Sequence, residues 1–135
     1  MKFFIDNNLP VALAQGLNEI SAPYQHSVLH LTSKFKPSTP DHVWINALAL
    51  EGDWIIISQD RLSKNHLEKI AFRESNLTAF FLIKGWSHIP YWEKAWKLTR
   101  WWPAIIEQAQ RVQAGASFQV PMQFSGKGKF KQHNY

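Results

Sequence analysis

The chain has 135 residues, of which 45% are hydrophobic and 14% aromatic, so it can form one domain with a buried core and is neither disordered nor fibrous. The sequence contains no cysteine, which excludes disulfide scaffolds, thiolate zinc sites and cysteine nucleophiles. No apolar run approaches the roughly 20 residues that span a bilayer, and the start MKFFIDNNLP lacks the pattern of a signal peptide. We therefore expect a soluble, cytoplasmic protein without a membrane partner.

The formal net charge of +5 is unevenly distributed along the chain. Residues 1–83 carry 7 Lys and Arg against 8 Asp and Glu, whereas residues 84–135 carry 8 against 2. Clustered basic side chains attract phosphates whatever the base sequence. The charge favours a nucleic acid as partner, without distinguishing a nuclease from a protein that only binds.

Apolar runs and helical spacings alternate through the first 85 residues. Short apolar runs predict strands at 2–5, 27–31, 54–58 and 78–83. Spacing and helix-start residues predict helices at 9–20, 40–50 and from about 63, the last with Leu67, Ile70 and Ala71 on one side. Unalternated strands separated by helices are typical of a parallel sheet covered on both faces. We expect a three-layer α/β/α domain with a central, mainly parallel sheet.

The composition changes from Pro90 onwards, and five of the seven tryptophans lie beyond residue 85. We expect two helices there, separated or kinked by Pro103, with Gly115 ending the second. The alternating residues 117–124 predict an edge strand, since Pro121 is tolerated only at an edge. The predicted organisation is a single domain over 1–124, comprising an α/β core (1–85) and a helical and edge-strand extension (86–124), followed by a flexible basic tail (125–135).

Three of the four aspartates stand at comparable places. Asp6 follows the first strand, Asp60 follows the third, and Asp41 opens the helix before the third strand. In a parallel sheet the carboxyl ends of the strands share one edge, where ligands bind. Each aspartate taken singly is more often a helix cap. Converging carboxylates, however, require a divalent cation or a shared proton, and oxygen ligands suit Mg²⁺ or Mn²⁺, which can activate water for phosphodiester hydrolysis.

The segments FFIDNNLP at 3–10 and DHVWINALALEGDWIIISQD at 41–60 resemble the PIN-like nucleases, in particular the short VapC-type toxins of prokaryotic toxin–antitoxin pairs. Those proteins have a hydrophobic strand ending in Asp, an acidic residue opening a helix, and an apolar strand followed by Ser/Thr-x-Asp. The resemblance covers roughly residues 1–85.

Carried over to matching positions, the resemblance implies that Asp6, Asp41 and Asp60 are the catalytic and metal-binding residues and that Ser58 supports them. It implies a metal-dependent endoribonuclease that uses Mg²⁺ or Mn²⁺, acts on structured or messenger RNA, and is silenced by a partner antitoxin.

The chain departs from the family pattern in two places. The usual DxDF-like ending reads Asp60-Arg61-Leu62, and the acidic residue that fuller PIN domains place between the first and third motifs has no clear counterpart. A catalytically weakened module that binds RNA or protein is therefore an alternative. A phosphoacceptor receiver using Asp6, Asp60 and Lys84 is a third interpretation, but receivers need an acidic pair where this chain has Asp6-Asn7.

Other polar residues have a functional and a plain interpretation. Asn8 can order metal-bound water or cap a helix, and Arg61 and Lys84 can contact phosphate or remain solvated. Three alternating lysines can form a row for RNA phosphates or a solubilising tail: Lys127, Lys129 and Lys131. The six histidines show no ligand pattern, which argues against zinc.

The C-terminal tryptophans also allow two interpretations. They can stack unpaired bases, but Trp92 and Trp96, four residues apart, more often pack a helix against the sheet or a partner. Because PIN-like toxins commonly pair, we expect a possible homodimer through these helices.

Overall fold

The computed structural model describes residues 1–83, 85–125 and 128–132, which form a six-stranded sheet between two layers of helices. The strands are Lys2–Ile5 (β1), Ser27–His30 (β2), Trp54–Ser58 (β3), Thr78–Phe81 (β4), Ser117–Gln119 (β5) and Lys131–Gln132 (β6). Their order is β2-β1-β3-β4-β5-β6, and only the β5–β6 pair is antiparallel. The predicted three-layer α/β/α fold with a mainly parallel sheet is confirmed.

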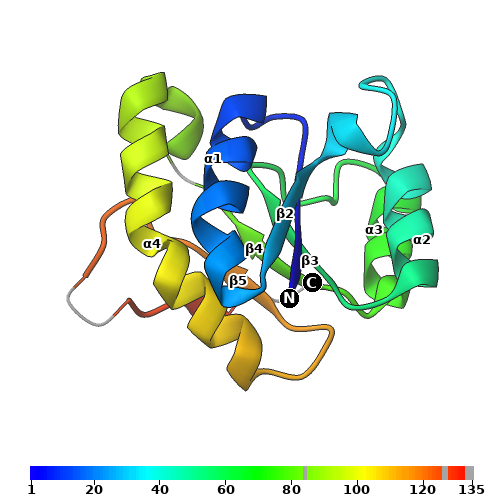
Figure 1. The fold of residues 1–135 in the computed structure, drawn as a ribbon. Helices are drawn as coiled ribbons and strands as arrows, with labels where there is room; N and C mark the ends of the chain where they lie inside the picture. The colour runs from blue at the N-terminus through cyan, green and yellow to red at the C-terminus, as the bar shows by residue number, and fades with distance from the viewer. Residues whose placement is uncertain (84, 126–127, 133–135) are drawn as a thin grey trace.

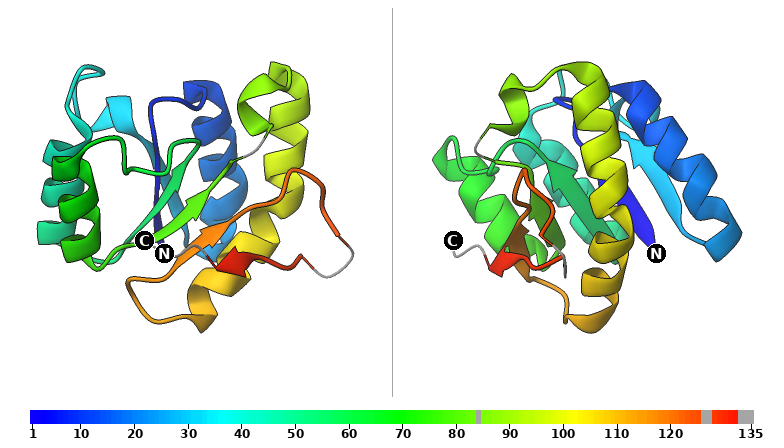
Figure 2. Two further views of the ribbon diagram at one scale, coloured as in Figure 1. Left: turned by 180° about the vertical axis from the view of Figure 1, so that it is seen from behind. Right: turned by 90° about the vertical axis from the view of Figure 1, so that its left-hand side faces the viewer.

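Four α-helices of the described residues cover the sheet (Figures 1 and 2). They are Val11–Ser21 (α1), Asp41–Glu51 (α2), His66–Ser75 (α3) and Tyr91–Arg111 (α4). Single 3₁₀ turns are Ala22–Tyr24 (η1), Leu31–Ser33 (η2) and Trp86–His88 (η3). Helices α1 and α4 lie on one face, and α2 and α3 lie on the other. None of the helices described here is both long and apolar enough to cross a membrane.

Each central strand contributes side chains to two separate cores. In β1, Phe3 and Ile5 pack under α1 and α4, whereas Phe4 packs under α2 and α3. In β3, Ile57 packs under α1 and α4, and Ile56 packs under α2 and α3. Successive side chains of a strand point to opposite faces, so a sheet buried on both faces needs continuous apolar strands. This is why the strand signals in the sequence do not alternate.

The prediction of two helices on either side of Pro103 is wrong. Helix α4 is one element that includes Pro103 and ends at Arg111, before Gly115. Its buried side chains form one face: Leu98, Trp101, Trp102, Ile105 and Ala109. Packing of this face continues on both sides of the proline, so it outweighs the loss of one backbone hydrogen bond.

The region after α4 also differs from the expectation of an edge strand followed by a free tail. Strand β5 is an inner strand, and Pro121 lies beyond its end. The edge is β6, whose neighbour Phe130 packs against Phe80, Trp101 and Phe118 with ring centroids 5.0–6.2 Å apart. The described part of the basic tail is therefore a structural part of the domain.

The inner face of α3 is not the predicted one. Leu67 and Ile70 are exposed, while Glu68 is buried together with Ala71 and Phe72. The helix begins at His66, with the Asn65 side chain accepting from the Glu68 N–H at 3.0 Å, instead of near Ser63. This shift turns an acidic side chain toward the interior of the molecule.

Candidate functional site

The carboxyl ends of β1 and β3 bring Asp6 and Ser58 together. The two strands are parallel neighbours, with Ile5 opposite Ile57, so the next residues along each strand meet at the sheet edge. The Ser58 hydroxyl donates to Asp6 Oδ2 at 2.7 Å, and the Asn7 N–H donates to Asp6 Oδ1 at 2.6 Å. From the sequence we expected Asp6 and Asp60 to share this edge, and the family resemblance implied a supporting role for Ser58.

Asp6 is buried among like charges. Only 5% of the Asp6 surface is exposed to solvent. Burial, followed by the nearby carboxylates of Asp41 and Asp60, raises its pKa to about 6, although the hydrogen bonds from Ser58 and Asn7 act in the opposite direction. The three predicted carboxylates are thus close enough to influence one another.

Asn8 connects the ends of the two strands. Its side-chain nitrogen lies 3.5 Å from both Asp6 Oδ2 and Ser58 Oγ, and its Oδ1 accepts from the Gln59 N–H at 3.2 Å. The Gln59 side chain donates back to the Asn8 carbonyl at 3.0 Å. Asn8 therefore connects the ends of β1 and β3 by hydrogen bonds, and its supporting role in a functional site stays a prediction.

Asp60 is fully engaged within its own loop. Its N–H donates to Ser58 Oγ at 2.9 Å, and its Oδ1 accepts from the N–H of Leu62 at 3.2 Å. Its Oδ2 forms an ion pair with Lys64 at 2.8 Å. Leu62 has a left-handed backbone with φ +55° that its buried side chain stabilises. The loop thus fixes the Asp60 carboxylate beside the Lys64 ammonium.

Asp41 does not act as a side-chain cap for α2. No side-chain capping bond is present at the start of this helix, and Asp41 Oδ1 accepts from the indole N–H of Trp44 at 2.9 Å. Trp44 is completely buried, so this bond fixes the carboxylate at the edge of the sheet.

Glu68 is a further acidic residue of the site that sequence analysis missed. It is 6% exposed and accepts from the Lys64 N–H at 3.0 Å. Burial raises its pKa, and a hydrogen-bonding contact with Asp41 and the charges of Asp41 and Asp60 act in the same direction. The available signal was Asn65-x-x-Glu68, a pattern typical of a helix start, which would have placed Glu68 in the first turn after Asp60.

The acidic residues fit a divalent cation in chemistry but not in spacing. Their oxygens are the ligands that Mg²⁺ and Mn²⁺ prefer. Across residues 1–83, 85–125 and 128–132, however, no three acidic or histidine side chains are gathered closely enough to hold a metal ion. The Lys64 ammonium already neutralises Asp60. A cation could be held here only after these side chains rearrange.

The predicted RNA-binding residues are spread over the molecule. Exposed Arg61 lines a polar hollow of about 570 Å³, together with Asn8, Asp60 and Ser87. Lys129 and Lys131 are exposed at the sheet edge that is three strands from β3. Lys84 and Lys127 lie outside the described residues. Of the three predicted residues that the structure describes, it brings only Arg61 to the carboxylates.

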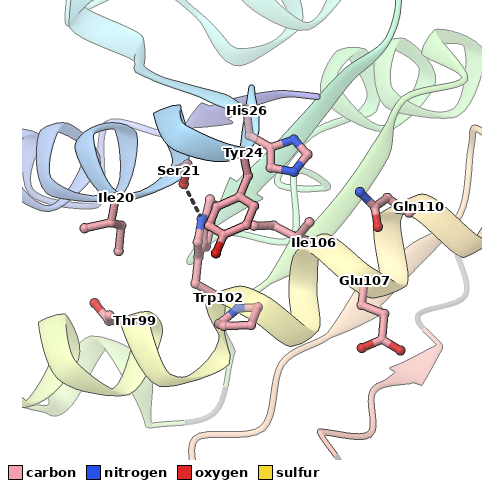
Figure 3. A pocket seen from close by; sticks show the side chains of 10 residues that line it. Ile20, Ser21, Tyr24, His26, Thr99, Trp102, Ile106, Glu107 and Gln110 are labelled. Carbon is pink, nitrogen blue, oxygen red and sulfur yellow. Dashed lines mark hydrogen bonds between the residues drawn. The ribbon is translucent and has the colours of Figure 1, made fainter.

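A second, apolar pocket of about 600 Å³ lies between the end of α1 and the middle of α4 (Figure 3). Ile20, Trp102 and Ile106 line it, and the Trp102 indole N–H donates to Ser21 Oγ at 2.9 Å. The end of α1 lies at the opposite end of the strands from the carboxyl end of β1, which Asp6 follows. The pocket contains none of the predicted site residues.

The fold and the acidic edge define a class of α/β proteins whose site lies at the carboxyl ends of parallel strands. A family model described as a PIN like domain matches residues 1–84, and the chain belongs to this family. PIN domains are generally nucleases and commonly use divalent metals, which supports nuclease chemistry on a nucleic acid in general. No curated protein and no solved structure matches the chain. The residues that the PIN-like family model matches end before α4 and include the acidic residues of the site: Asp6, Asp41, Asp60 and Glu68.

Proposed function

We propose that this protein is a metal-dependent endoribonuclease and the toxin component of a prokaryotic toxin–antitoxin pair. The observation that carries the proposal is the burial of Asp6 at the carboxyl end of β1, within reach of the charges of Asp41 and Asp60. Mutually repelling carboxylates favour a bound cation. Membership of the PIN-like family supports the choice of a phosphodiester as substrate.

In this proposal Asp6, Asp41 and Asp60 would hold Mg²⁺ or Mn²⁺ after their side chains rearrange and Asp60 leaves Lys64, and Glu68 would join them as a fourth oxygen donor. Ser58 and Asn8 orient Asp6 through the hydrogen bonds described above. When bound, the cation would supply Lewis-acid activation and neutralise charge on the phosphate.

The basic residues grip the RNA backbone in the proposed enzyme, without reading its sequence. They comprise the residues predicted for this role: Arg61, Lys84, Lys127, Lys129 and Lys131. The proposed protein partner is a cognate antitoxin, with a homodimer as a further assembly. Light scattering of the pure protein and co-purification with the product of a neighbouring small gene test these two assemblies.

One observation favours a second candidate, a PIN-like module that binds RNA or protein without cleaving it. Among the described residues, no group of side chains is arranged to bind a metal ion, and Lys64 forms an ion pair with Asp60. Tight RNA binding without Mg²⁺-dependent cleavage would identify this function.

The proposed activity is tested by incubating RNA with Mg²⁺ or with EDTA and comparing the parent protein with Asp6→Asn. We expect cleavage by the parent with Mg²⁺ and a loss of at least about 100-fold in the variant, because the buried carboxylate is replaced by a neutral amide of the same shape. Asp53→Asn is the matched control, since Asp53 is exposed and outside the site. Equal cleavage by the parent and Asp6→Asn would discard the assignment.

A further inference from the structure

Two tryptophans near the start of α4 are exposed on the surface. Trp92 is 80% exposed and Trp96 59%, whereas Trp101 and Trp102 of the same helix are buried in the core under α1 and α4. The sequence favoured packing of Trp92 and Trp96 against the sheet or against a partner, and packing against the sheet is wrong. Exposed apolar side chains that lie together mark interaction sites in soluble proteins, whereas single ones need no explanation.

The two tryptophans begin a stripe along the outer side of α4, which we call the outer stripe. Its members follow one another at alternating steps of four and three residues, and all are exposed except the half-buried Ile106: Trp92, Trp96, Thr99, Pro103, Ile106 and Gln110. Such steps keep side chains on one side of a helix, and they are the steps at which two helices pack along each other. The buried Leu98 and Ile105 belong to the side that covers the sheet.

The apolar pocket between α1 and α4 is part of the same surface (Figure 3). In helix pairs, four residues at positions i, i+3, i+4 and i+7 surround the hole that receives one side chain of the facing helix. The α4 wall of the pocket contains two such sets in succession: Thr99, Trp102, Pro103 and Ile106, then Pro103, Ile106, Glu107 and Gln110. Ile20 and Tyr24 from the end of α1 form the opposite wall.

The projecting side chains and the holes of one chain match those of a second copy. Trp92 and Trp96 are four residues apart, and the two holes are also displaced by four residues. When a second α4 lies antiparallel, Trp96 meets the first hole and Trp92 meets the second, and both copies make the same contacts, as a closed twofold pair requires. In a parallel arrangement the tryptophans of only one copy would reach the holes, so the contact would not close.

The surface that such a pair would bury is large enough for a dimer. Four apolar side chains of the stripe and the pocket are 54–80% exposed: Trp92, Trp96, Tyr24 and Ile20. At about 200 Å² for a whole side chain of this size, their exposed parts amount to about 500 Å² in each copy. Together the two copies bury about 1,000 Å² from these residues alone, which is about the area that a specific interface needs.

The charges beside the outer stripe do not oppose this contact. The Lys97 ammonium lies 3.9 Å from the Glu93 carboxylate, and Arg111 forms an ion pair with Glu107, so both acidic residues are neutralised within α4. Arg100 lies over Phe124, 3.7 Å from its ring centre. A second copy can therefore approach without leaving an unpaired carboxylate beside the stripe.

We propose that two copies of this chain pair through α4, antiparallel about a twofold axis at Thr99, with Trp92 and Trp96 of each copy seated in the apolar pocket of the other. This inference assigns a surface and a direction to the homodimer, and it does not depend on the ribonuclease function. Helix α4 begins at the edge of the sheet where β1 ends (Figure 1). Antiparallel pairing therefore places the two acidic sites at opposite ends of the dimer, each formed by one chain.

Sedimentation equilibrium of the full chain measures the dissociation constant of the dimer. Trp92→Ala and Trp96→Ala are each expected to raise it at least about 30-fold, because truncation of a central aromatic contact costs about 2 kcal/mol and each tenfold corresponds to about 1.4 kcal/mol. Tyr24→Ala, on the opposite wall of the pocket, should also raise it. Leu50→Ala is the control, since Leu50 is 91% exposed on α2, on the other face of the sheet.

Cross-linking tests the direction of pairing. The chain has no cysteine, so Thr99→Cys and Gln110→Cys each carry a single thiol. In the antiparallel pair the two Thr99 positions meet at the axis, whereas the two Gln110 positions are about 30 Å apart at a rise of about 1.5 Å per residue. Thr99→Cys should therefore form a disulfide-linked dimer on mild oxidation, and Gln110→Cys should not.

A parent protein that sediments as a monomer at every concentration would overturn the proposal. So would a dimer whose dissociation constant is unchanged in both tryptophan variants while circular dichroism shows the parent fold. Cross-linking of Gln110→Cys as readily as Thr99→Cys would contradict the antiparallel direction. If the parent is monomeric and Trp92→Ala binds RNA more weakly, the outer stripe is a nucleic-acid surface instead. None of these measurements uses cleavage, so the pairing and the ribonuclease function fail independently.

Discussion

Burial of Asp6 makes stability depend on pH. In the unfolded chain this carboxyl has its ordinary pKa of 3.8, whereas in the folded protein the pKa is about 6. Between these values the folded state holds a proton that the unfolded state has lost. The contribution of Asp6 to the free energy of unfolding therefore falls as pH rises from about 4 to about 6 and stays low above it.

Asp6→Asn should remove this pH dependence. The variant is expected to be more stable than the parent at pH 7 by up to about 3 kcal/mol, since each pKa unit corresponds to about 1.4 kcal/mol, while the two proteins differ little at pH 4. Urea unfolding from pH 4 to 8 measures this. The free energy of unfolding of the exposed Asp53→Asn variant should depend on pH as it does in the parent. If Asp6→Asn shows the same pH dependence as the parent, Asp6 has its ordinary pKa in the folded protein.

Lys64 provides the counter-charge for the acidic site in the absence of metal. Its pKa is raised by the hydrogen bond and charge of Asp60 and further by Asp41 and Glu68. A divalent cation that binds these carboxylates competes with the ammonium, which makes Lys64 a residue that opposes metal binding.

Lys64→Gln should therefore bind Mn²⁺ more tightly than the parent. We expect a gain of about fivefold, the size of one partly exposed ion pair, measured by isothermal titration calorimetry at pH 7. Lys69→Gln is the control, because Lys69 is exposed on α3 and makes no ion pair with the described residues. Weaker Mn²⁺ binding in Lys64→Gln would mean that Lys64 helps to build the metal site.

At the scale of elements, the C-terminal segment adds the last strand to the sheet. Strand β6 covers the edge of β5, and Phe130 packs between Phe80, Phe118 and Trp101 of α4. Covering an edge strand also protects it from pairing with another chain.

Phe130→Ala is expected to lower the free energy of unfolding by about 1–3 kcal/mol, because it removes aromatic contacts that are partly buried. Chemical denaturation measures the loss. Lys129→Ala, one residue earlier and exposed, should change stability by less than about 0.5 kcal/mol. A Phe130→Ala protein as stable as the parent would show that the segment is not held in solution.

On the scale of the whole molecule, positive charge is concentrated in the C-terminal part of the chain. Residues 1–83, which include the acidic site, carry a net charge of −1, whereas residues 84–135 carry +6. Such a separation directs a polyanion to the basic part and still presents its backbone to the carboxylates, provided that cations are bound there.

RNA binding should consequently weaken steeply with salt. The slope of log affinity against log salt concentration is expected to become less steep by up to about 1.4 in Lys129→Ala/Lys131→Ala, at about 0.7 per phosphate contact in a single strand. Anisotropy titrations from low to physiological salt measure the slope. Arg73→Ala in the last turn of α3 should leave it unchanged. An unaltered slope in the double lysine variant would exclude these residues from the RNA path.

Much of the fold could be predicted because it depends on local patterns. The apolar runs predicted β1 and β3 with the bounds that the structure shows. Strands β2 and β4 are slightly shorter in the structure than predicted. The position of Asp6 after a strand was sufficient to place it at the sheet edge, since all strands of a parallel sheet end on one side. Chain order and residue type thus determined the layers and the general location of the site.

Tertiary contacts decided the remainder. Glu68 meets Asp41, and Phe130 packs beside Trp101, only because segments distant in sequence come together. Trp96 and Trp101 look alike in sequence, yet one is exposed and the other buried, according to which side of α4 faces the sheet. Burial and neighbouring charge are properties of three-dimensional surroundings, so the sequence alone determined which groups could act, and the folded structure determined which of them meet.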